Sequence, residues 1–361
     1  MDSRRRLVSR VLGDGLSVSA AAKEAKVTRP TAYLWLQRAK DHGVAEMEEE
    51  SRRPRNIPVM VEAGIADLVI QTRRMHPTWG SRKLRVVLWP DNDAPICERT
   101  IDRILKRADL LREPRIILES PIRFERGLPN ELWQMDFKGL GENPPPYKIL
   151  SVVDDCTRFL VSLSRISHAR GELVFSALWN VLGQYGLPLA ILSDNEHCFH
   201  CRYSRGPSLL EAKLWRLGIS THHGRPGHPQ TQGKVERFHR TLQEDKGKDL
   251  RNPTQVDNAL ATFRQEYNWL RPHQAIELQT PGKLYKPSPR PRPSTLPESV
   301  PPSGCPVRIV DGTGTFKYQG HRYKAGKGLI GEQVALVESD GETFIQYANH
   351  KFATLSQTRT R

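Results

Sequence analysis

The order of predicted strands and helices in the middle of the chain constrains its fold more than any other feature. Three segments with strand-forming composition follow one another, at residues 132–137, 147–153 and 157–163. Short strands then alternate with helical patterns, in the order helix 171–185, strand 187–193, helix 207–217 and strand 219–221. Two longer helices are predicted at 230–246 and 254–269. This order is typical of a mixed α/β sheet covered by helices.

The first 44 residues carry a helix-turn-helix pattern. Residues 16–25 form a short helical segment with an alanine-rich face, which lets a second helix approach closely. A turn at 26–28 follows, and Thr28 can cap a helix over 30–40 that begins with a proline. Thr31, Tyr33 and Arg38 of that helix could face a DNA major groove. A plain helical hairpin is the alternative, and the pattern favours the DNA-reading unit over it.

A second helical unit is predicted over residues 58–112. Apolar residues recur at helical spacing over 61–75, and Ser81 is expected to cap the next helix after the breakers Pro77 and Gly80. A further helix over 98–108 presents basic side chains: Arg99, Arg103, Lys106 and Arg107. This resembles a second helix-turn-helix, and two readers in tandem suit a long DNA site.

Connectors divide the chain into domains. Charged or proline-containing linkers are predicted at 45–57 and 113–129, and the proline-rich segment 286–303 should be an extended, semi-rigid spacer. Residues 304–361 show short strands separated by glycine turns, which predicts a small β-barrel. Residues 130–285 then form the central α/β domain.

Charge and composition limit the partners and the compartment. Fifty-five Lys and Arg against 40 Asp and Glu give a net charge of +15, which points to a polyanion such as nucleic acid, although a generally basic enzyme is the alternative. No apolar run is long enough for a transmembrane helix, and no signal peptide is recognisable. The five cysteines are too few and too dispersed for a disulfide framework, so we expect a cytoplasmic protein.

Three acidic residues stand out against this background. Asp136 lies inside a predicted strand, Asp194 ends another, and Glu236 lies on a predicted helix, so the three could converge at one edge of the sheet. Mg²⁺ prefers oxygen ligands, and two such ions can drive phosphodiester transfer without a side-chain nucleophile. For any one of these acids alone, a structural salt bridge or cap is the simpler interpretation.

The surroundings of the three acids carry a resemblance to a known family. The segments 132–137 (LWQMDF), 192–195 (LSDN) and 227–240 (GHPQTQGKVERFHR) resemble the catalytic core of retroviral integrases and bacterial insertion-sequence transposases. These belong to the DDE superfamily, which has an RNase H-like fold. The segments 76–80 (HPTWG), 271–274 (RPHQ) and 280–281 (TP) also resemble bacterial members.

The resemblance implies a function for most of the chain. It implies that Asp136, Asp194 and Glu236 bind Mg²⁺, with Mn²⁺ able to substitute, and that the protein is a DNA transposase. Such an enzyme binds the terminal inverted repeats of its element, nicks the ends and transfers the freed 3′-hydroxyl to target DNA. Because two ends must be joined, a homodimer or larger assembly is expected on DNA, associated with the nucleoid. Whether an accessory ATPase takes part stays open.

Two departures from the family pattern concern the segment after Asp194. Asn195 is followed by Glu196 where the family usually has glycine, and Glu236 follows Asp194 by 42 positions, a longer interval than usual. The surplus fits an enlarged loop that includes His197, Cys198, His200 and Cys201. These four potential ligands are too crowded to bind one zinc ion easily, which favours a loop near the active site instead.

Several other polar residues each allow two interpretations. Lys234, Arg237 and Arg240 suit a DNA-facing helix, or else an ordinary solvated surface. His222 and His223 could contact DNA phosphate or simply end a polar strand. Asp154 and Asp155 are predicted to be turn residues outside the metal site.

Two rival functions remain at this point. One is a nuclease that hydrolyses DNA without joining ends. The other is a catalytically silent, sequence-specific DNA-binding regulator or a relic of an element, against which the retention of all three acids argues.

Overall fold

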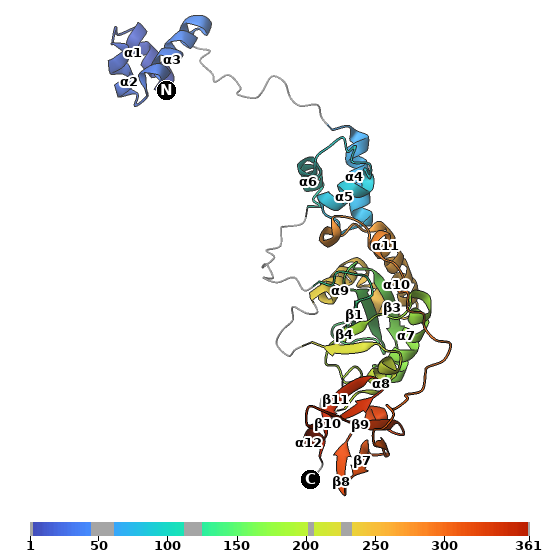
Figure 1. Ribbon diagram of the computed structural model, residues 1–361. Coiled ribbons are helices and arrows are strands. Elements are labelled where there is room, and N and C mark those ends of the chain that lie inside the picture. The colour runs from blue at the N-terminus through green and yellow to red at the C-terminus, as the bar shows by residue number, and fades with distance from the viewer. Residues whose placement is uncertain (1–2, 45–60, 112–124, 201–205, 225–232, 360–361) are drawn as a thin grey trace. The chain divides into compact units, whose positions relative to one another are not determined.

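The computed structural model describes residues 3–44, 61–111, 125–200, 206–224 and 233–359. Its contacts separate the chain into two compact units, residues 1–60 and 61–361 (Figure 1). The predicted linker 45–57 and most of the linker 113–129 lie outside the described residues. Among the helices that are described, none combines the length and the apolar character needed to cross a bilayer.

The N-terminal unit is a three-helix domain. It contains α1 (Ser3–Leu12), α2 (Val18–Glu24) and α3 (Arg29–His42), of which α1 was not predicted. Thr28 caps α3 through a hydrogen bond accepted from the backbone N–H of Thr31. Ala21, Ala22 and Ala32 are buried where α2 meets α3, which confirms the close approach predicted from small residues.

A second group of helices opens the larger unit. It contains α4 (Ala63–Met75), α5 (Ser81–Leu88) and α6 (Glu98–Arg107). Their shared core is built around Val69, Trp79, Leu84 and Ile101. The predicted cap is wrong by one position, because Gly80 is the N-cap and Ser81 is the first helical residue. Ser81 therefore begins the helix, and no side chain caps it.

A five-stranded sheet forms the centre of the larger unit. Its order is β3-β2-β1-β4-β5. The strands are β1 (Leu132–Lys138), β2 (Lys148–Asp154), β3 (Leu160–Ile166), β4 (Ala190–Ser193) and β5 (Ser220–His223). The first three pair antiparallel, whereas β4 and β5 run parallel to β1. The predicted mixed α/β sheet is confirmed.

Helices cover both faces of this sheet (Figure 1). Helices α7 (Gly171–Tyr185) and α8 (Leu209–Arg216) pack on one face, and α9 (Gly233–Lys246) and α10 (Val256–Gln265) pack on the other. Side chains alternate along a strand, and Trp133, Met135 and Phe137 of β1 point towards α7 and α8. Asp136 therefore points to the α9 side.

The C-terminal strands form two open sheets, so the predicted closed β-barrel is not confirmed. One sheet has four strands in the order β11-β10-β9-β6, and the other is the β7-β8 hairpin. The strands are β6 (Val307–Ile309), β7 (Thr315–Tyr318), β8 (His321–Lys324), β9 (Gln333–Ser339), β10 (Glu342–Tyr347) and β11 (His350–Thr354). Their apolar side chains pack on Ala212 and Trp215 of α8. A helix of the neighbouring domain thus covers surface that a barrel would enclose by itself.

The proline-rich segment is extended, as predicted, but it is attached to the central domain rather than spanning free space. The N–H of Ser288 donates to the carbonyl of Tyr185 (2.7 Å), and the N–H of Leu187 donates to that of Arg290 (2.8 Å). The guanidinium of Arg292 lies 4.2 Å from the ring centroid of Trp179 on α7. The segment therefore fixes where the C-terminal sheets begin.

Gly186→Ala tests this attachment. Gly186 has φ +78°, and a Cβ there would meet the carbonyl oxygens of Ser288 at 2.7 Å and Arg290 at 2.8 Å. We expect a loss of about 1–3 kcal/mol in the free energy of unfolding, measured by urea titration. Gly64→Ala, in open space on α4, is the matched control and should be neutral or slightly stabilising. Equal effects of the two substitutions would contradict the assigned close approach.

Candidate active site

Asp136 lies on β1 opposite Ser151 of β2, on the side of the sheet that α9 covers. Its Oδ1 accepts the N–H of Phe137 (2.8 Å), and its Oδ2 lies 3.6 Å from Nδ1 of His239 on α9. Ser151 Oγ donates to the carbonyl of Asp136 and lies 2.7 Å from Nε2 of His239. Burial, followed by the charge of Lys138, lowers the pKa of His239 to about 3, so this histidine is neutral beside the carboxylate.

Asp194 follows β4 directly, and β4 is the parallel neighbour of β1. Since Met135 pairs with Ser193, the two aspartates each come one residue later on adjacent strands. Asp194 Oδ1 accepts the N–H of Glu196 (3.0 Å), and Glu196 forms an ion pair with Lys148 of β2. The geometry of parallel strands thus brings the two acids to one edge of the sheet.

The charges at this edge repel one another. Burial, and then the charge of Asp194, raise the pKa of Asp136 to about 7, and Glu196 and Glu236 act in the same direction. Burial also raises the pKa of Asp194. A proton or a cation bound here would relieve this repulsion, which is the electrostatic signature of a metal-binding carboxylate cluster.

Glu236 lies in the first turn of α9. The helix buries Val235, Phe238 and Leu242 against the sheet and leaves Glu236 exposed. Within the described part of the chain, no lysine or arginine forms an ion pair with any of the three acids. Each of the three carboxylates offers oxygen donors, the ligand type that Mg²⁺ prefers. Residues 225–232, which precede α9 in the motif, lie outside the described residues.

Three polar residues near the acids were not predicted to take part in the site. These are Ser151, Glu196 and His239. The spacing of three residues puts His239 and Glu236 on one face of the helix, but no role at the site was predicted for His239. Glu196 could have been suspected because it stands where the family pattern has glycine.

Lys234 occupies a different environment from the DNA-facing one expected. Its Nζ lies 2.7 Å from Oδ1 of Asp155 and donates to the Asp155 carbonyl (2.9 Å). Asp155 is fully buried and also accepts from Nε2 of Gln134 (2.6 Å). Lys234 therefore ties the start of α9 to the turn after β2. Asp155 is a turn residue as predicted, whereas Asp154 is the last residue of β2, and its Oδ1 accepts from the backbone N–H and the hydroxyl of Thr157.

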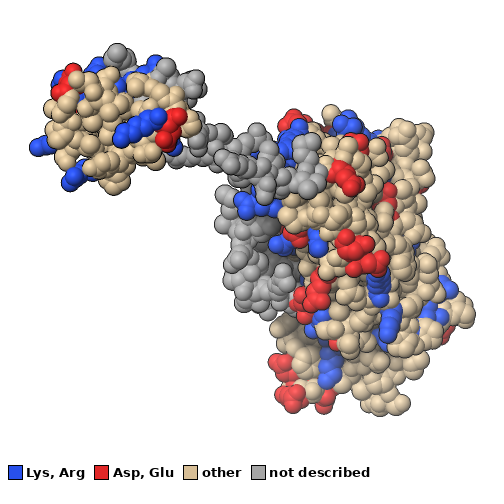
Figure 2. Space-filling model, turned by 90° about the horizontal axis from the view of Figure 1, so that it is seen from above, with Lys and Arg blue, Asp and Glu red and all other residues tan. Residues whose placement is uncertain are grey.

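The other residues expected to contact DNA differ in exposure. Those that are exposed are Tyr33, Arg99, Arg103, Lys106, Arg237 and Arg240. Thr31 and Arg38 are half-buried, and the Thr31 hydroxyl lies 2.8 Å from that of Thr28. Figure 2 shows Lys and Arg interspersed with Asp and Glu on this face of the larger unit, rather than gathered into one continuous patch.

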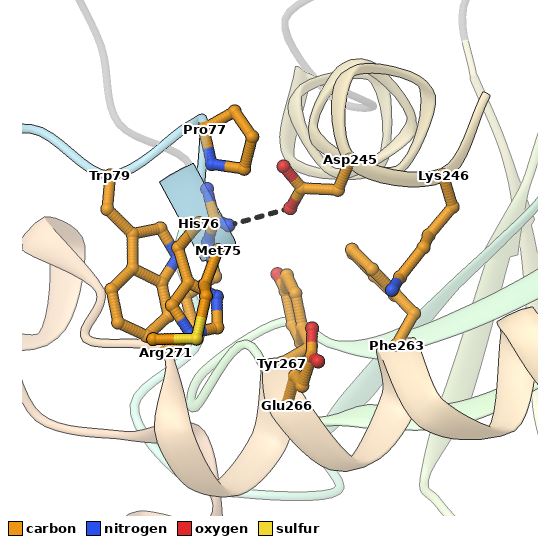
Figure 3. A pocket seen from close by; sticks show the side chains of 10 residues that line it. All are labelled: Met75, His76, Pro77, Trp79, Asp245, Lys246, Phe263, Glu266, Tyr267 and Arg271. Carbon is orange, nitrogen blue, oxygen red and sulfur yellow. Dashed lines mark hydrogen bonds and ion pairs between the residues drawn. The ribbon is translucent and has the colours of Figure 1, made fainter. Parts of the chain in front are cut away.

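Two short segments singled out in the sequence meet in the structure. Nη1 of Arg271, from the segment 271–274, lies 2.9 Å from Oγ1 of Thr78, from the segment 76–80. The same nitrogen lies 3.0 Å from Oδ2 of Asp245 on α9. Figure 3 shows Arg271 and Asp245 at a small pocket between α4, α9 and α10, where His76 stacks on Trp79. Arg271 thus joins the second helical group to α9.

The histidine- and cysteine-containing loop is only partly described, because Cys201 lies outside the described residues. Cys198 is buried, and burial raises the pKa of its thiol to about 12, which disfavours a thiolate ligand. His197 is exposed, whereas His200 lies 3.7 Å from a carboxylate oxygen of Glu211. His223 also points inward to Glu211, while His222 is exposed. His197, Cys198 and His200 therefore do not form one ligand set.

Family models match the central and N-terminal regions. Residues 127–229 and 217–281 each match a model described as an integrase core domain. Residues 31–105 match a model described as a homeodomain-like domain.

Two proteins similar to this chain come from insertion elements. The chain is 23% identical over 278 residues to an uncharacterized 39.2 kDa protein of insertion element IS476 from Xanthomonas euvesicatoria, covering 75% of this chain and 78% of the relative. It is 26% identical over 161 residues to an uncharacterized 31.7 kDa protein of insertion element IS407 from Burkholderia multivorans, covering 44% of this chain and 56% of the relative.

Similar solved structures are viral integrases. One is the catalytic core domain of HTLV-2 integrase in complex with magnesium, with a TM-score of 0.35, 21% identity, and coverage of 44% of this chain and 99% of that chain. Another is a simian T-cell lymphotropic virus intasome in complex with a PP2A regulatory subunit, with a TM-score of 0.39, 21% identity, and coverage of 82% and 98%.

Proposed function

We propose that this chain, which matches integrase core domain models over residues 127–229 and 217–281, is a DDE transposase that cuts DNA at the ends of its own element and joins those ends to a target. The observation that carries the proposal is the pair Asp136 and Asp194 on adjacent parallel strands, with the pKa of Asp136 raised to about 7 by burial and by its neighbour. Structural salt bridges have the opposite effect on a carboxylate.

Asp136, Asp194 and Glu236 are the proposed ligands of Mg²⁺, which Mn²⁺ can replace. Metal bound by these residues would supply activation of the attacking oxygen and stabilisation of the leaving one. The chain's own groups hold the ligands in place: Ser151 and His239 surround Asp136, and the N–H of Glu196 fixes Asp194. Lys148 forms an ion pair with Glu196, and its charge offsets part of the repulsion that Glu196 adds at Asp194.

DNA recognition is assigned to the two helical regions, residues 1–44 and 58–112, which would bind the terminal inverted repeats. Four of the predicted DNA-contact side chains are exposed and lie outside the cores of the two helical groups. They are Tyr33 on α3 and Arg99, Arg103 and Lys106 on α6. Thr31 and Arg38, although half-buried, lie on the same helix as Tyr33. Arg237 and Arg240 follow Glu236 on α9, are exposed like it, and would contact phosphates near the reacting strand. Lys234 would act indirectly, by fixing the start of α9.

The assembly follows from the reaction. Two element ends must be held together, so we propose a homodimer or larger oligomer on DNA, working in the cytoplasm on the nucleoid. Residues 304–361 would contact DNA or another subunit. No residue described here calls for an accessory ATPase, and reconstitution from the purified chain would decide that point.

Strand transfer in vitro tests the proposal. The purified chain is incubated with end DNA of its own element, a target plasmid and Mg²⁺, beside Glu236→Gln and a reaction containing EDTA. We expect joined products that disappear in the variant and with EDTA. Nicked but never joined DNA would favour a hydrolytic nuclease. Sequence-specific binding without nicking, in Mg²⁺ and in Mn²⁺, would favour a silent DNA-binding regulator.

A further inference from the structure

A second group of metal-ligand side chains lies beside the acidic site but is separate from it. It consists of His200 in the loop after β4, Glu211 on α8 and His223 at the end of β5. Nε2 of His223 lies 2.7 Å from Oε1 of Glu211, and Nδ1 of His200 lies 3.7 Å from the same oxygen. One ligand atom from each of the three side chains lies within 4.8 Å of the others. Three distant segments of the chain thus place two imidazoles around one buried carboxylate.

Glu211 is held rigidly in this position. Its Oε2 accepts the N–H of Ser208 (2.6 Å), while Ser208 Oγ accepts the N–H of Glu211 in return, so the two residues form a capping box at the start of α8. Ser208 Oγ also donates to the carbonyl of Phe199, the residue before His200. The cap therefore leaves Oε1 directed at the imidazoles and ties down the loop that carries one of them.

His223 has the arrangement expected of a metal ligand. While Nε2 faces Glu211, its Nδ1 lies 3.2 Å from Oγ of Ser193, the residue before Asp194. Histidines that bind metals usually donate their second ring N–H to a fixed polar group, which sets the tautomer. The adjacent His222 is exposed instead. Strand alternation therefore selects one of two consecutive histidines for the interior.

We propose that His200, Glu211 and His223 bind one zinc ion, with water as the fourth ligand, and that this ion fixes the segment that follows Asp194. Tetrahedral zinc with bonds of about 2.0–2.1 Å keeps its ligand atoms about 3.4 Å apart. The distances of 2.7 and 3.7 Å lie on either side of that value, so small side-chain movements suffice. The proposal does not depend on the DNA-joining activity.

Ligand chemistry separates this site from the acidic one. Two imidazoles and one carboxylate suit zinc, whereas the all-oxygen set of Asp136, Asp194 and Glu236 suits Mg²⁺. The position also gives the ion a structural consequence. Helix α8 packs through Ala212 and Trp215 on the C-terminal sheets, so the ion would join the loop after Asp194 to the helix on which those sheets rest (Figure 1).

The experiment measures the zinc content of the full-length, tag-free chain by mass spectrometry after gel filtration in metal-free buffer. We expect about one zinc per chain, and at least about tenfold weaker zinc binding in His200→Ala and in His223→Gln. His197→Ala and His222→Ala remove neighbouring exposed histidines and should keep the zinc. Asp136→Asn should keep it too, because it alters only the acidic site.

Cobalt substitution gives a second readout that needs no variant. Co²⁺ bound in place of zinc should show the intense visible absorption of tetrahedral coordination, and zinc should remove it. Zinc retained undiminished by both His200→Ala and His223→Gln would overturn the proposal. So would a wild-type chain that binds neither ion, since the His223–Glu211 contact is then only a hydrogen bond. If a variant fails to fold, the wild-type cobalt spectrum alone decides.

Discussion

Asp136→Asn is expected to make the metal-free protein more stable and, at the same time, inactive in strand transfer. The pKa of Asp136 is raised from 3.8 to about 7, so above pH 7 the folded state carries an ionised carboxylate that it disfavours. That difference corresponds to a cost of up to about 4 kcal/mol. Asparagine keeps an oxygen for the N–H of Phe137 and removes the charge. We expect a gain of about 1–3 kcal/mol at pH 8, measured by urea unfolding in EDTA.

The free energy of unfolding of the wild type should fall as pH rises, because the pKa of Asp136 is raised. Between pH 4 and pH 7 the folded chain binds more protons at Asp136 than the unfolded chain does, so the wild type loses stability as pH rises. The advantage of Asp136→Asn should therefore grow over this range and stay constant above pH 7. Mg²⁺ should stabilise the wild type and leave the variant unchanged.

Activity should move in the opposite direction from stability. Loss of a metal ligand removes several kcal/mol of transition-state stabilisation, and we expect strand transfer to fall by at least about 10³-fold. Asp155→Asn is the matched control, since that buried aspartate is paired with Lys234. It should destabilise the chain, because it leaves a buried ammonium without its partner. If Asp136→Asn were destabilising as well, Asp136 would be a structural residue rather than a metal ligand.

The sequence predicted the sheet because strands and helices depend on local patterns, and it placed the three acidic residues on or next to those elements. Strand composition and alternation identified β1 and placed Asp136 on the face opposite Trp133 and Met135. A strand that ends at Ser193 identified Asp194 in the same way. These features need only the periodicity of a few residues. The helix predicted before β4 is also consistent with β4 running parallel to another strand, because parallel strands need a long connection.

Long-range partners could not be predicted in this way. Lys234, Arg237 and Arg240 are all basic residues of one helix, and the sequence does not distinguish their environments. In the structure Lys234 pairs with a buried aspartate 79 positions earlier in the chain. The four potential ligands between His197 and Cys201 suggested a crowded local site, whereas His200 meets Glu211 and His223 from other elements. Ion pairs and ligand sets depend on tertiary placement, which sequence spacing does not encode.

Sheet closure is a similar case. Short strands with glycine turns at Gly312 and Gly341 predicted a barrel, but the β7-β8 hairpin pairs with no other strand among those described. Whether a sheet closes depends on what covers its apolar face. Here Trp215 of α8 supplies that cover, and nothing in residues 304–361 indicates it.

Arg271→Ala is expected to be among the most destabilising single substitutions in the larger unit. The Arg271 side chain is 8% exposed and its partner Asp245 is 13% exposed, so alanine leaves a buried carboxylate uncompensated. Burial lowers the pKa of Arg271 itself, and the charge of Asp245 opposes that effect. Breaking such a pair from one side costs about 3–5 kcal/mol. The measurement is urea unfolding of the full chain, with Arg82→Ala as a control.

Arg82 pairs with Glu98 on the surface, with side chains 63% and 42% exposed, and its loss should cost no more than about 1 kcal/mol. Adding Asp245→Asn to Arg271→Ala should recover part of the lost stability, because the second change removes the stranded charge. Equal effects of Arg271→Ala and Arg82→Ala would show that the pair is not buried in solution.

Since Arg271 also contacts Thr78, its loss should expose the segment 76–80 to limited proteolysis before the central sheet unfolds. The helix that carries Glu236 would then no longer be joined to the helical group formed by α4, α5 and α6.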